Sequence, residues 1–313
     1  MIHPSPIGLS GFIGALGLVA HLAAAPVSIP IPNGSFEWPS TEFVSTRIDR
    51  WQEFAATPTY SEAGGFAWDQ LTGLFRNTAP GAGDHLSNLD GRQALYLFAI
   101  PGVGLFQDGM SRDWDDPEPT RDFTVRFAPG STYTLGARVQ GGGGGMREGV
   151  SLELCLYYRN ASGGQVDVAR TEVIHSGAVF SDRQRLLPIS VTTAPVQATD
   201  AWAGQSVGIR LRSTVASELA GGYWDVDEIT LDRQAAHALQ LEWSWDTDSS
   251  PKRLRIAWAS ETNRAYRVES SIDGTSWTVR TDPIQGTGER LSWSVDTEQS
   301  GSLWLRVVAT SGS

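Results

Sequence analysis

Residues 150–159, VSLELCLYYR, place an apolar side chain at every second position, with Leu152, Leu154 and Leu156 in phase. An alternation of period two is typical of a β-strand with one buried face. Cys155 is the only cysteine of the chain and alternates with these leucines, so we expect it to be a small core residue. A single cysteine allows no internal disulfide. The stretch therefore predicts a core strand of a β protein.

Runs of the same kind follow one another along most of the chain, separated by Gly, Pro, Asp and Ser. None has a sustained helical period with capping residues, and the nearest rival, 176–186, has poor apolar spacing. We interpret GGGGG (141–145) as a flexible hairpin loop. Many short strands at loose ten-residue spacing predict an all-β sandwich or jelly roll. The strands predicted for this first series are 94–100, 122–128, 132–140, 150–159, 187–193, 205–214 and 224–231.

The composition changes near residue 233. RQAAHA (233–238) is interpreted as a linker, and a second series of strand patterns follows it, rich in tryptophan. Its Asp273-Gly274 pair is a hairpin signal. We therefore predict a larger domain at 26–233, a linker at 234–238 and a small β-sandwich at 239–313.

The N-terminal stretch IGLSGFIGALGLVAHL (7–22) is apolar and uncharged, and small residues follow it. It is short for a membrane span, so residues 1–25 are predicted to be a signal peptide of a secreted protein. The preceding residues contain no Lys or Arg, which is unusual for a signal peptide, and a buried pair of apolar strands is the alternative. No second apolar run exists, so we expect a soluble mature chain with no membrane partner.

The charge balance limits the classes of partner that we expect the chain to bind. Lys and Arg number 24 against 35 Asp and Glu, which gives a net charge of −11. Such a chain repels phosphate backbones and anionic lipid surfaces, so nucleic acid is not an expected partner. Lys252 is the only lysine, which leaves almost no scope for a lysine nucleophile. The oligomeric state stays open.

Four stretches occur in an order that resembles the galactose-binding-like jelly-roll modules, many of which are secreted carbohydrate-binding modules. They are PNGSFE (32–37), DGRQALYLFAIPGVGLFQD (90–108), APGSTYTLGARV (128–139) and WDVDEITL (224–231). The resemblance covers about residues 30–233 and implies a galactose-binding-like jelly-roll sandwich. AYRVESSIDGTSWT (265–278) resembles immunoglobulin- or fibronectin-like domains at the C-termini of secreted bacterial proteins.

The first resemblance also implies a structural calcium ion where the first and last strands adjoin. Its ligand positions correspond to Glu37 and Asp227, and this sequence adds Asp225 and Glu228 nearby. We expect Phe36 to be buried at the start of the first strand and Glu37 to lie near Asp227. A second acidic stretch, DWDDPEPTRD (113–122), lacks the glycine and terminal glutamate of an EF-hand loop and is interpreted as a solvated insertion.

A sugar site needs flat aromatic faces and planar polar groups beside them. The stretch TYSEAGGFAWDQ (59–70) combines both types of residue in a glycine-containing loop. Packing within the sandwich is the alternative role for each aromatic residue. The candidate sugar-binding residues are Trp51, Tyr60, Phe66, Trp68, Asp69 and Gln70.

Catalytic signals are weak. His85, His175 and His237 have no informative spacing, and no zinc-protease, serine-hydrolase or phosphate-loop motif occurs. Paired carboxylates suited to glycoside hydrolysis cannot be singled out among so many acids. The preferred function is non-catalytic binding of a polysaccharide or glycan, with calcium as a structural ion. The alternatives are a structural, surface-associated extracellular protein without a sugar site, and a carbohydrate-active enzyme.

Overall fold

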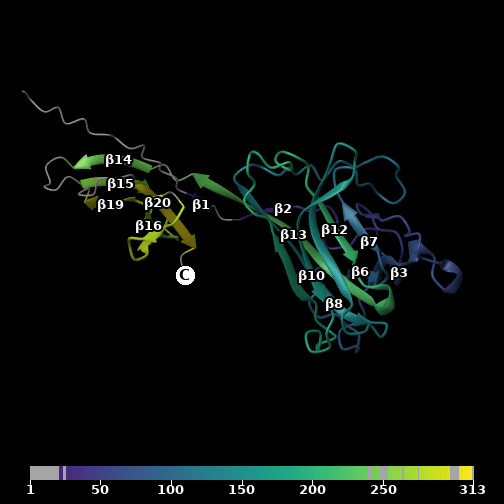
Figure 1. Cartoon of the computed structure of the whole chain (residues 1–313). Coiled ribbons are helices and arrows are strands. Elements are labelled where there is room, and N and C mark those ends of the chain that lie inside the picture. Colours follow the sequence, from purple (N-terminus) through teal and green to yellow (C-terminus); the bar gives the residue numbers. More distant parts are fainter. Residues whose placement is uncertain are drawn as a thin grey trace, which may run out of the picture. The chain divides into compact units, whose positions relative to one another are not determined.

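The structure is a computed structural model that describes residues 21–23, 26–238, 241–246, 253–262, 264–273, 275–296 and 303–311 (Figure 1). The chain divides into two compact units, residues 26–235 and residues 236–313 together with 1–25. The predicted signal peptide lies outside the described residues except for strand β1 (His21–Ala23). No helix in the described part of the chain is long and apolar enough to cross a membrane.

The described residues confirm an all-β fold. The first unit contains three short 3-10 helices, η1 (Glu62–Gly64), η2 (Trp68–Gln70) and η3 (Ser217–Leu219). Its strands are β2 (Val27–Ile29), β3 (Val44–Ser45), β4 (Gln52–Glu53), β5 (Thr72–Arg76), β6 (Gln93–Phe98), β7 (Gly104–Gln107), β8 (Ser131–Gly143), β9 (Ser151–Arg159), β10 (Gln165–Ile174), β11 (Leu187–Thr192), β12 (Gly208–Ser213) and β13 (Tyr223–Ala238).

These strands form two antiparallel sheets. In one, the order is β3-β5-β6-β13-β8-β11, with β2 paired to β13 beyond the end of β6. In the other, the order is β10-β9-β12-β7-β4. Leu95 and Leu97 of β6 share one hydrophobic core with Leu154 of β9 and Leu211 of β12. The two sheets therefore pack face to face as a sandwich, with the period-two alternation of each strand deciding which side chains point inward.

The stretch that opens this unit packs against the strand that closes it. Phe36 is fully buried, as expected, and contacts Trp51 with ring centroids 5.4 Å apart. It does not start a strand, because residues 32–35 form a turn and Phe36 has a φ of +56°. The backbone N–H of Ile229 in β13 donates to the carbonyl of Gly34 at 2.8 Å.

Several local predictions differ from the structure. Residues 122–128 form only an isolated bridge between Arg126 and Ser206, whereas the unpredicted strand β10 pairs along its length with β9. The predicted linker 234–238 is the last part of β13, and Gln234 pairs with Thr132 of β8.

The glycine run predicted to be a flexible loop is largely part of the sheet, since β8 continues to Gly143. A Cβ on Gly141 would approach the ring of Trp224 to 2.7 Å, and one on Gly143 would overlap the ring of Tyr223. At these two positions the absence of a side chain therefore makes space for aromatic rings of the neighbouring strand β13.

The C-terminal unit is a small β-sandwich. One sheet has the order β14 (Leu241–Asp246), β15 (Arg253–Ala259) and β19 (Arg290–Asp296). The other contains β16 (Arg264–Ser271), β17 (Thr278–Val279), β18 (Ile284–Gln285) and β20 (Trp304–Ser311), with β1 beside β20. Ile256, Val268 and Val307 meet in its core. Its likeness to immunoglobulin or fibronectin domains stays a prediction.

Candidate ligand pocket

A cavity of about 730 Å³ lies on the outer face of the β5-β6-β13 sheet in the first unit. Its floor follows from strand alternation. Tyr96 and Phe98 of β6 alternate with the core residues Leu95 and Leu97, so they point away from the core. The residues that line the cavity are Phe43, Val44, Thr46, Phe66, Gln70, Phe75, Arg76, Thr78, Gly83, Asp84, Leu86, Tyr96, Phe98, Arg183, Tyr223 and Asp225.

Aromatic rings form much of the wall, centred on Phe98. Its ring centroid lies 5.1 Å from that of Phe66 and 6.0 Å from those of both Tyr96 and Tyr223. The corresponding interplanar angles are 50°, 82° and 49°, so the rings are inclined to one another. The wall is a set of tilted faces and edges, not one flat platform.

Asp225 supplies a carboxyl group on the floor of the cavity. It is half-buried, and within the described part of the chain its side chain has no hydrogen bond or ion pair. Desolvation raises the pKa of Asp225 to about 7, and the positive charge of Arg183 opposes this shift. Burial also raises the pKa of the Tyr223 hydroxyl, with a contribution from Asp225. Asp225, Arg183 and Tyr223 therefore interact electrostatically at one end of the cavity.

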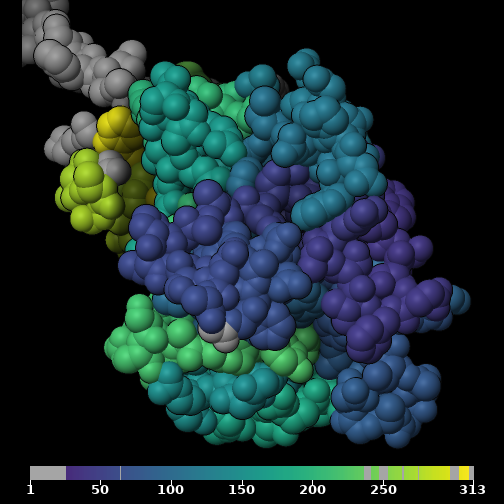
Figure 2. Space-filling model, turned by 90° about the vertical axis from the view of Figure 1, so that its right-hand side faces the viewer, coloured from purple at the N-terminus to yellow at the C-terminus, as the bar shows by residue number. Residues whose placement is uncertain are grey.

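The loop predicted to carry the sugar site forms another part of the wall, and Figure 2 shows this segment, in blue, on the surface of the first unit. Phe66 and Gln70 line the cavity, as a binding role requires. The hydroxyl of Tyr60 donates to the carbonyl of Phe66 at 2.7 Å, and Gln70 Oε1 accepts from the N–H of Ala67 at 2.9 Å. Tyr60 thus supports the loop behind Phe66.

Three other predicted residues do not line the cavity. Trp68 is half-buried, with its indole N–H donating to the carbonyl of Phe54 at 2.7 Å, and it packs on Tyr60 with ring centroids 5.1 Å apart. Asp69 is exposed to solvent. Trp51 is only 3% exposed, and its indole N–H donates to the carbonyl of Asn33, so this side chain is a core residue and not a ligand contact.

The strand residues of the floor were not predicted as site residues. A signal for two of them is present in ALYLFAI (94–100), where the outward positions are occupied by Tyr96 and Phe98 rather than by polar residues. Large aromatic side chains on the outward face of a strand need a partner, a covering loop or a ligand. Tyr223 and Asp225 join them only because β13, far away in the sequence, pairs with β6.

Two of the three acids predicted to bind calcium, Glu37 and Asp227, accept hydrogen bonds from one backbone segment. Glu37 Oε1 accepts the N–H groups of Arg92 and Gln93, both at 2.8 Å, and Asp227 Oδ2 accepts the N–H of Asp90 at 2.6 Å. Desolvation, together with the charges of Asp90 and Glu37, raises the pKa of Asp227 to about 7. Both carboxylates therefore anchor the backbone of residues 90–93, which leads into β6, to the opening stretch and to β13.

Two further features at this seam concern cation binding, a buried carboxylate oxygen and a cavity nearby. Asp227 is fully buried, and its Oδ1 has no hydrogen-bond partner. A second cavity, of about 430 Å³, is lined by Glu37, Asp90 and Glu228 among others. The described residues contain no group of three or more His, Cys, Asp or Glu side chains arranged to hold a metal ion. Asp225, the third predicted ligand, lies in the aromatic cavity.

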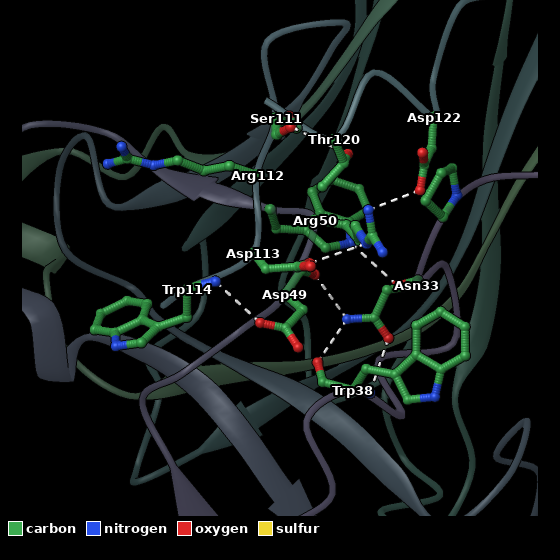
Figure 3. A network of polar contacts seen from close by, with 12 residues as sticks. Asn33, Trp38, Asp49, Arg50, Ser111, Arg112, Asp113, Trp114, Thr120 and Asp122 are labelled. Carbon is green, nitrogen blue, oxygen red and sulfur yellow. Dashed lines mark hydrogen bonds and ion pairs between the residues drawn. The ribbon is translucent and has the colours of Figure 1, made fainter. Parts of the chain in front are cut away.

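The acidic stretch 113–122 is attached to the body of the unit by a polar network (Figure 3). Arg50 pairs with Asp113 at 2.9 Å and with Asp122 at 2.7 Å. Asp49 Oδ1 accepts the backbone N–H of Trp114 at 2.9 Å. Asp113 and Asp122 thus serve as anchors, whereas Asp115 is exposed as expected for a solvated insertion.

No protein-family model and no curated protein matches the sequence. Among solved structures, a cyclase from Fischerella sp. TAU shares 21% identity and a TM-score of 0.48, over 68% of this chain and 100% of that one. The CBM22-1 xylan-binding domain of Paenibacillus barcinonensis Xyn10C shares 13% identity and a TM-score of 0.34, over 70% and 99% of the two chains. Neither similarity is close enough to assign a function, which has to rest on the site.

Proposed function

We propose that the chain is a secreted, non-catalytic carbohydrate-binding protein, and that the aromatic cavity of the first unit is its glycan site. The main supporting observation is that Phe66, Phe98 and Tyr223 present inclined ring faces to one cavity. The same cavity is lined by the polar side chains of Asp225 and Gln70. Aromatic faces pack on the apolar side of a sugar ring, and carboxyl and amide groups bind its hydroxyls. A purely structural role would not need this hollow.

A glycan array followed by calorimetry on the full chain tests this function. Phe66 is 53% exposed, so Phe66→Ala should remove ligand contact with little effect on folding. The matched control is Trp114→Ala, which truncates another exposed aromatic residue outside the cavity. Binding that is weakened by Phe66→Ala and unchanged by Trp114→Ala supports the proposal. The absence of any glycan ligand for the folded chain would refute it.

A carbohydrate-active enzyme is the second candidate, because the same cavity contains the carboxyl groups of both Asp84 and Asp225. Glycoside hydrolysis uses two such groups, one as an acid and one as a base or nucleophile. Turnover of aryl glycosides that is lost in Asp225→Asn, with binding retained, would favour this function over simple recognition. Binding without any turnover favours the non-catalytic function.

We also propose that calcium stabilises the seam between the opening stretch and β13. Glu37 and Asp227 would hold the ion, with further oxygens from backbone carbonyls and water, which suits the hard Ca²⁺ cation. The support is the buried, unpartnered Oδ1 of Asp227 beside a second carboxylate. The ion would neutralise the repulsion between these acids.

Thermal unfolding with calcium and with a chelator tests the ion. We expect calcium to raise Tm in the wild type, and Glu37→Gln to abolish the response. Asp225→Asn should keep the response, since that residue lines the other cavity, and Asp115→Asn in the exposed loop serves as the control. Equal Tm values with calcium and chelator in the wild type would exclude a structural calcium site.

A further inference from the structure

The shape of the aromatic cavity restricts what it can hold. A run of sugar rings along an extended chain is bound by aromatic faces spaced along a line, whereas Phe66, Tyr96 and Tyr223 all cluster around the single ring of Phe98, each inclined to it by 49° or more. Inclined rings surround one compact group from several sides. The wall therefore resembles an enclosure for a single substituted ring or a small head group.

The charges of the cavity are unevenly distributed between floor and rim. Arg76 is ion-paired with Glu42, so its charge is already compensated. At the rim, Arg183 and Asp84 are both exposed and carry opposite charges. On the floor, the half-buried Asp225 is left as the acid without an ion pair in the described part of the chain. The interior thus combines electron-rich ring faces with a carboxyl group that has no direct ion pair and only the charge of the exposed Arg183 near it.

We propose that this cavity selects a sugar that carries a cationic amino group. The inference rests on the proposed glycan-binding function and narrows its ligand class to amino sugars. A cation gains from the faces of Tyr96, Phe98 and Tyr223 and from the Asp225 carboxylate in a partly desolvated site. An acidic sugar would be repelled by that carboxylate, and a neutral sugar would provide no opposite charge for it. The chain's net charge of −11 further attracts cations.

Arg183 is a rim cation that opposes the binding of a cationic sugar, so the selection can be tested with a variant that should strengthen it. Its guanidinium lies over Gly142, where a Cβ would overlap it, and it interacts electrostatically with Asp225 and Tyr223. Its removal should therefore strengthen cation binding, whereas removal of Asp225 should weaken it. A neutral sugar should respond little to either change.

Isothermal titration calorimetry of the full chain at pH 8 tests the inference with three methyl glycosides. The probes are N,N,N-trimethylglucosamine as a permanent cation, N-acetylglucosamine as a neutral analogue and glucuronic acid as an anion. We expect the cation to bind about tenfold more tightly than the neutral sugar, with the preference falling as salt is added. Asp225→Asn should reduce the preference to near parity, Arg183→Gln should increase it, and Trp114→Ala should leave it unchanged.

The outcomes separate this inference from the function on which it rests. Equal affinity for the cationic and neutral sugars, or a preference for the anion, overturns the cation selectivity and leaves glycan binding intact. Binding of tetramethylammonium chloride without binding of any sugar keeps the cation site and overturns the sugar class. No binding of any probe overturns both. If Asp225→Asn does not fold, as judged by its Tm, the increase expected for Arg183→Gln and the salt series provide the test.

Discussion

Tyr96 of β6 and Asp225 of β13 lie directly opposite each other in the antiparallel ladder, and both side chains line the aromatic cavity. Their neighbours Leu95, Trp224 and Val226 are fully buried on the other side of the same sheet. Because alternation fixes which residues share a face, the packing of the core also positions the cavity floor. The candidate site is thus built on strands, not only on loops.

A substitution at Gly73 of β5 tests this dependence, because Gly73 lies opposite Tyr96 of β6. A Cβ at Gly73 would overlap the Tyr96 hydroxyl and lie 2.5 Å from the carbonyl oxygen of Ser45. We expect Gly73→Ala to displace the Tyr96 ring into the cavity and to weaken glycan binding at least tenfold, measured by calorimetry. Gly83→Ala is the control, because Gly83 also lines the cavity but has open space around its Cβ position. Equal affinities of both variants would contradict the assigned role of Gly73.

Trp51 gives a prediction about stability. The side chain is 3% exposed and packs on Phe36, so Trp51→Ala removes a large buried ring and leaves a cavity. The expected loss in the free energy of unfolding of the first unit is about 3–5 kcal/mol, measured by urea denaturation. Trp38→Ala should change it by less than about 0.5 kcal/mol, because that ring is 57% exposed. A Trp51→Ala protein of wild-type stability would show that the ring is not a core residue.

Glu53 predicts a pH dependence of stability. Its carboxyl group accepts a hydrogen bond from Thr72 Oγ1 at 2.5 Å, but desolvation raises its pKa from 4.5 to about 7. The folded chain therefore holds this proton to higher pH than the unfolded chain does. The free energy of unfolding should therefore fall as pH rises from about 4.5 to 7. Its slope with pH should stay below the slope expected for the release of one full proton.

Urea denaturation across that pH range checks the contribution of Glu53. Glu53→Gln should flatten the fall, because the amide does not titrate, while it can still accept from Thr72. Glu118→Gln, at an exposed position, should leave the profile unchanged. If the Glu53→Gln profile overlays that of the wild type, the carboxyl group does not have the raised pKa.

The sequence allowed the all-β class to be predicted because alternation is a local property. VSLELCLYYR and ALYLFAI correspond to β9 and β6 within one or two residues. Residues 122–128 show a similar pattern but pair only at Arg126, because pairing depends on a partner elsewhere in the chain. The prediction of a flexible loop at the glycine run was wrong for the same reason, since the side chains that pack against Gly141, Gly142 and Gly143 come from distant segments, among them Trp224, Arg183 and Tyr223.

The candidate site could be predicted only in part. Phe66 and Gln70 belong to one loop, and local composition was enough to indicate them. Trp51 and Trp68 carry the same chemistry, but their burial is decided by tertiary packing, which composition does not reveal. Asp225 was assigned to calcium because it is near Asp227 in sequence, whereas pairing with β6 places it in the aromatic cavity.

The opposite sheet carries a buried ion pair that also permits a matched test. Arg210 of β12 donates to Glu153 of β9 at 2.9 Å, and both residues are almost fully buried. Arg210→Met would leave this buried carboxylate with two longer ion pairs, to Arg170 at 3.6 Å and to Arg212 at 3.7 Å. It would also remove the partner that Arg210 provides to Asp167 at 2.8 Å.

We expect Arg210→Met to reduce the free energy of unfolding by about 3 kcal/mol, the low end of the cost of breaking a buried ion pair, because Arg170 and Arg212 still compensate part of the charge of Glu153. A second change, Glu153→Leu, removes the stranded carboxylate and should recover part of the loss. Arg47→Met is the control, since its pair with Asp115 is exposed and should contribute less than about 1 kcal/mol. A double variant less stable than Arg210→Met alone would show that Glu153 is held mainly by other partners and not by Arg210.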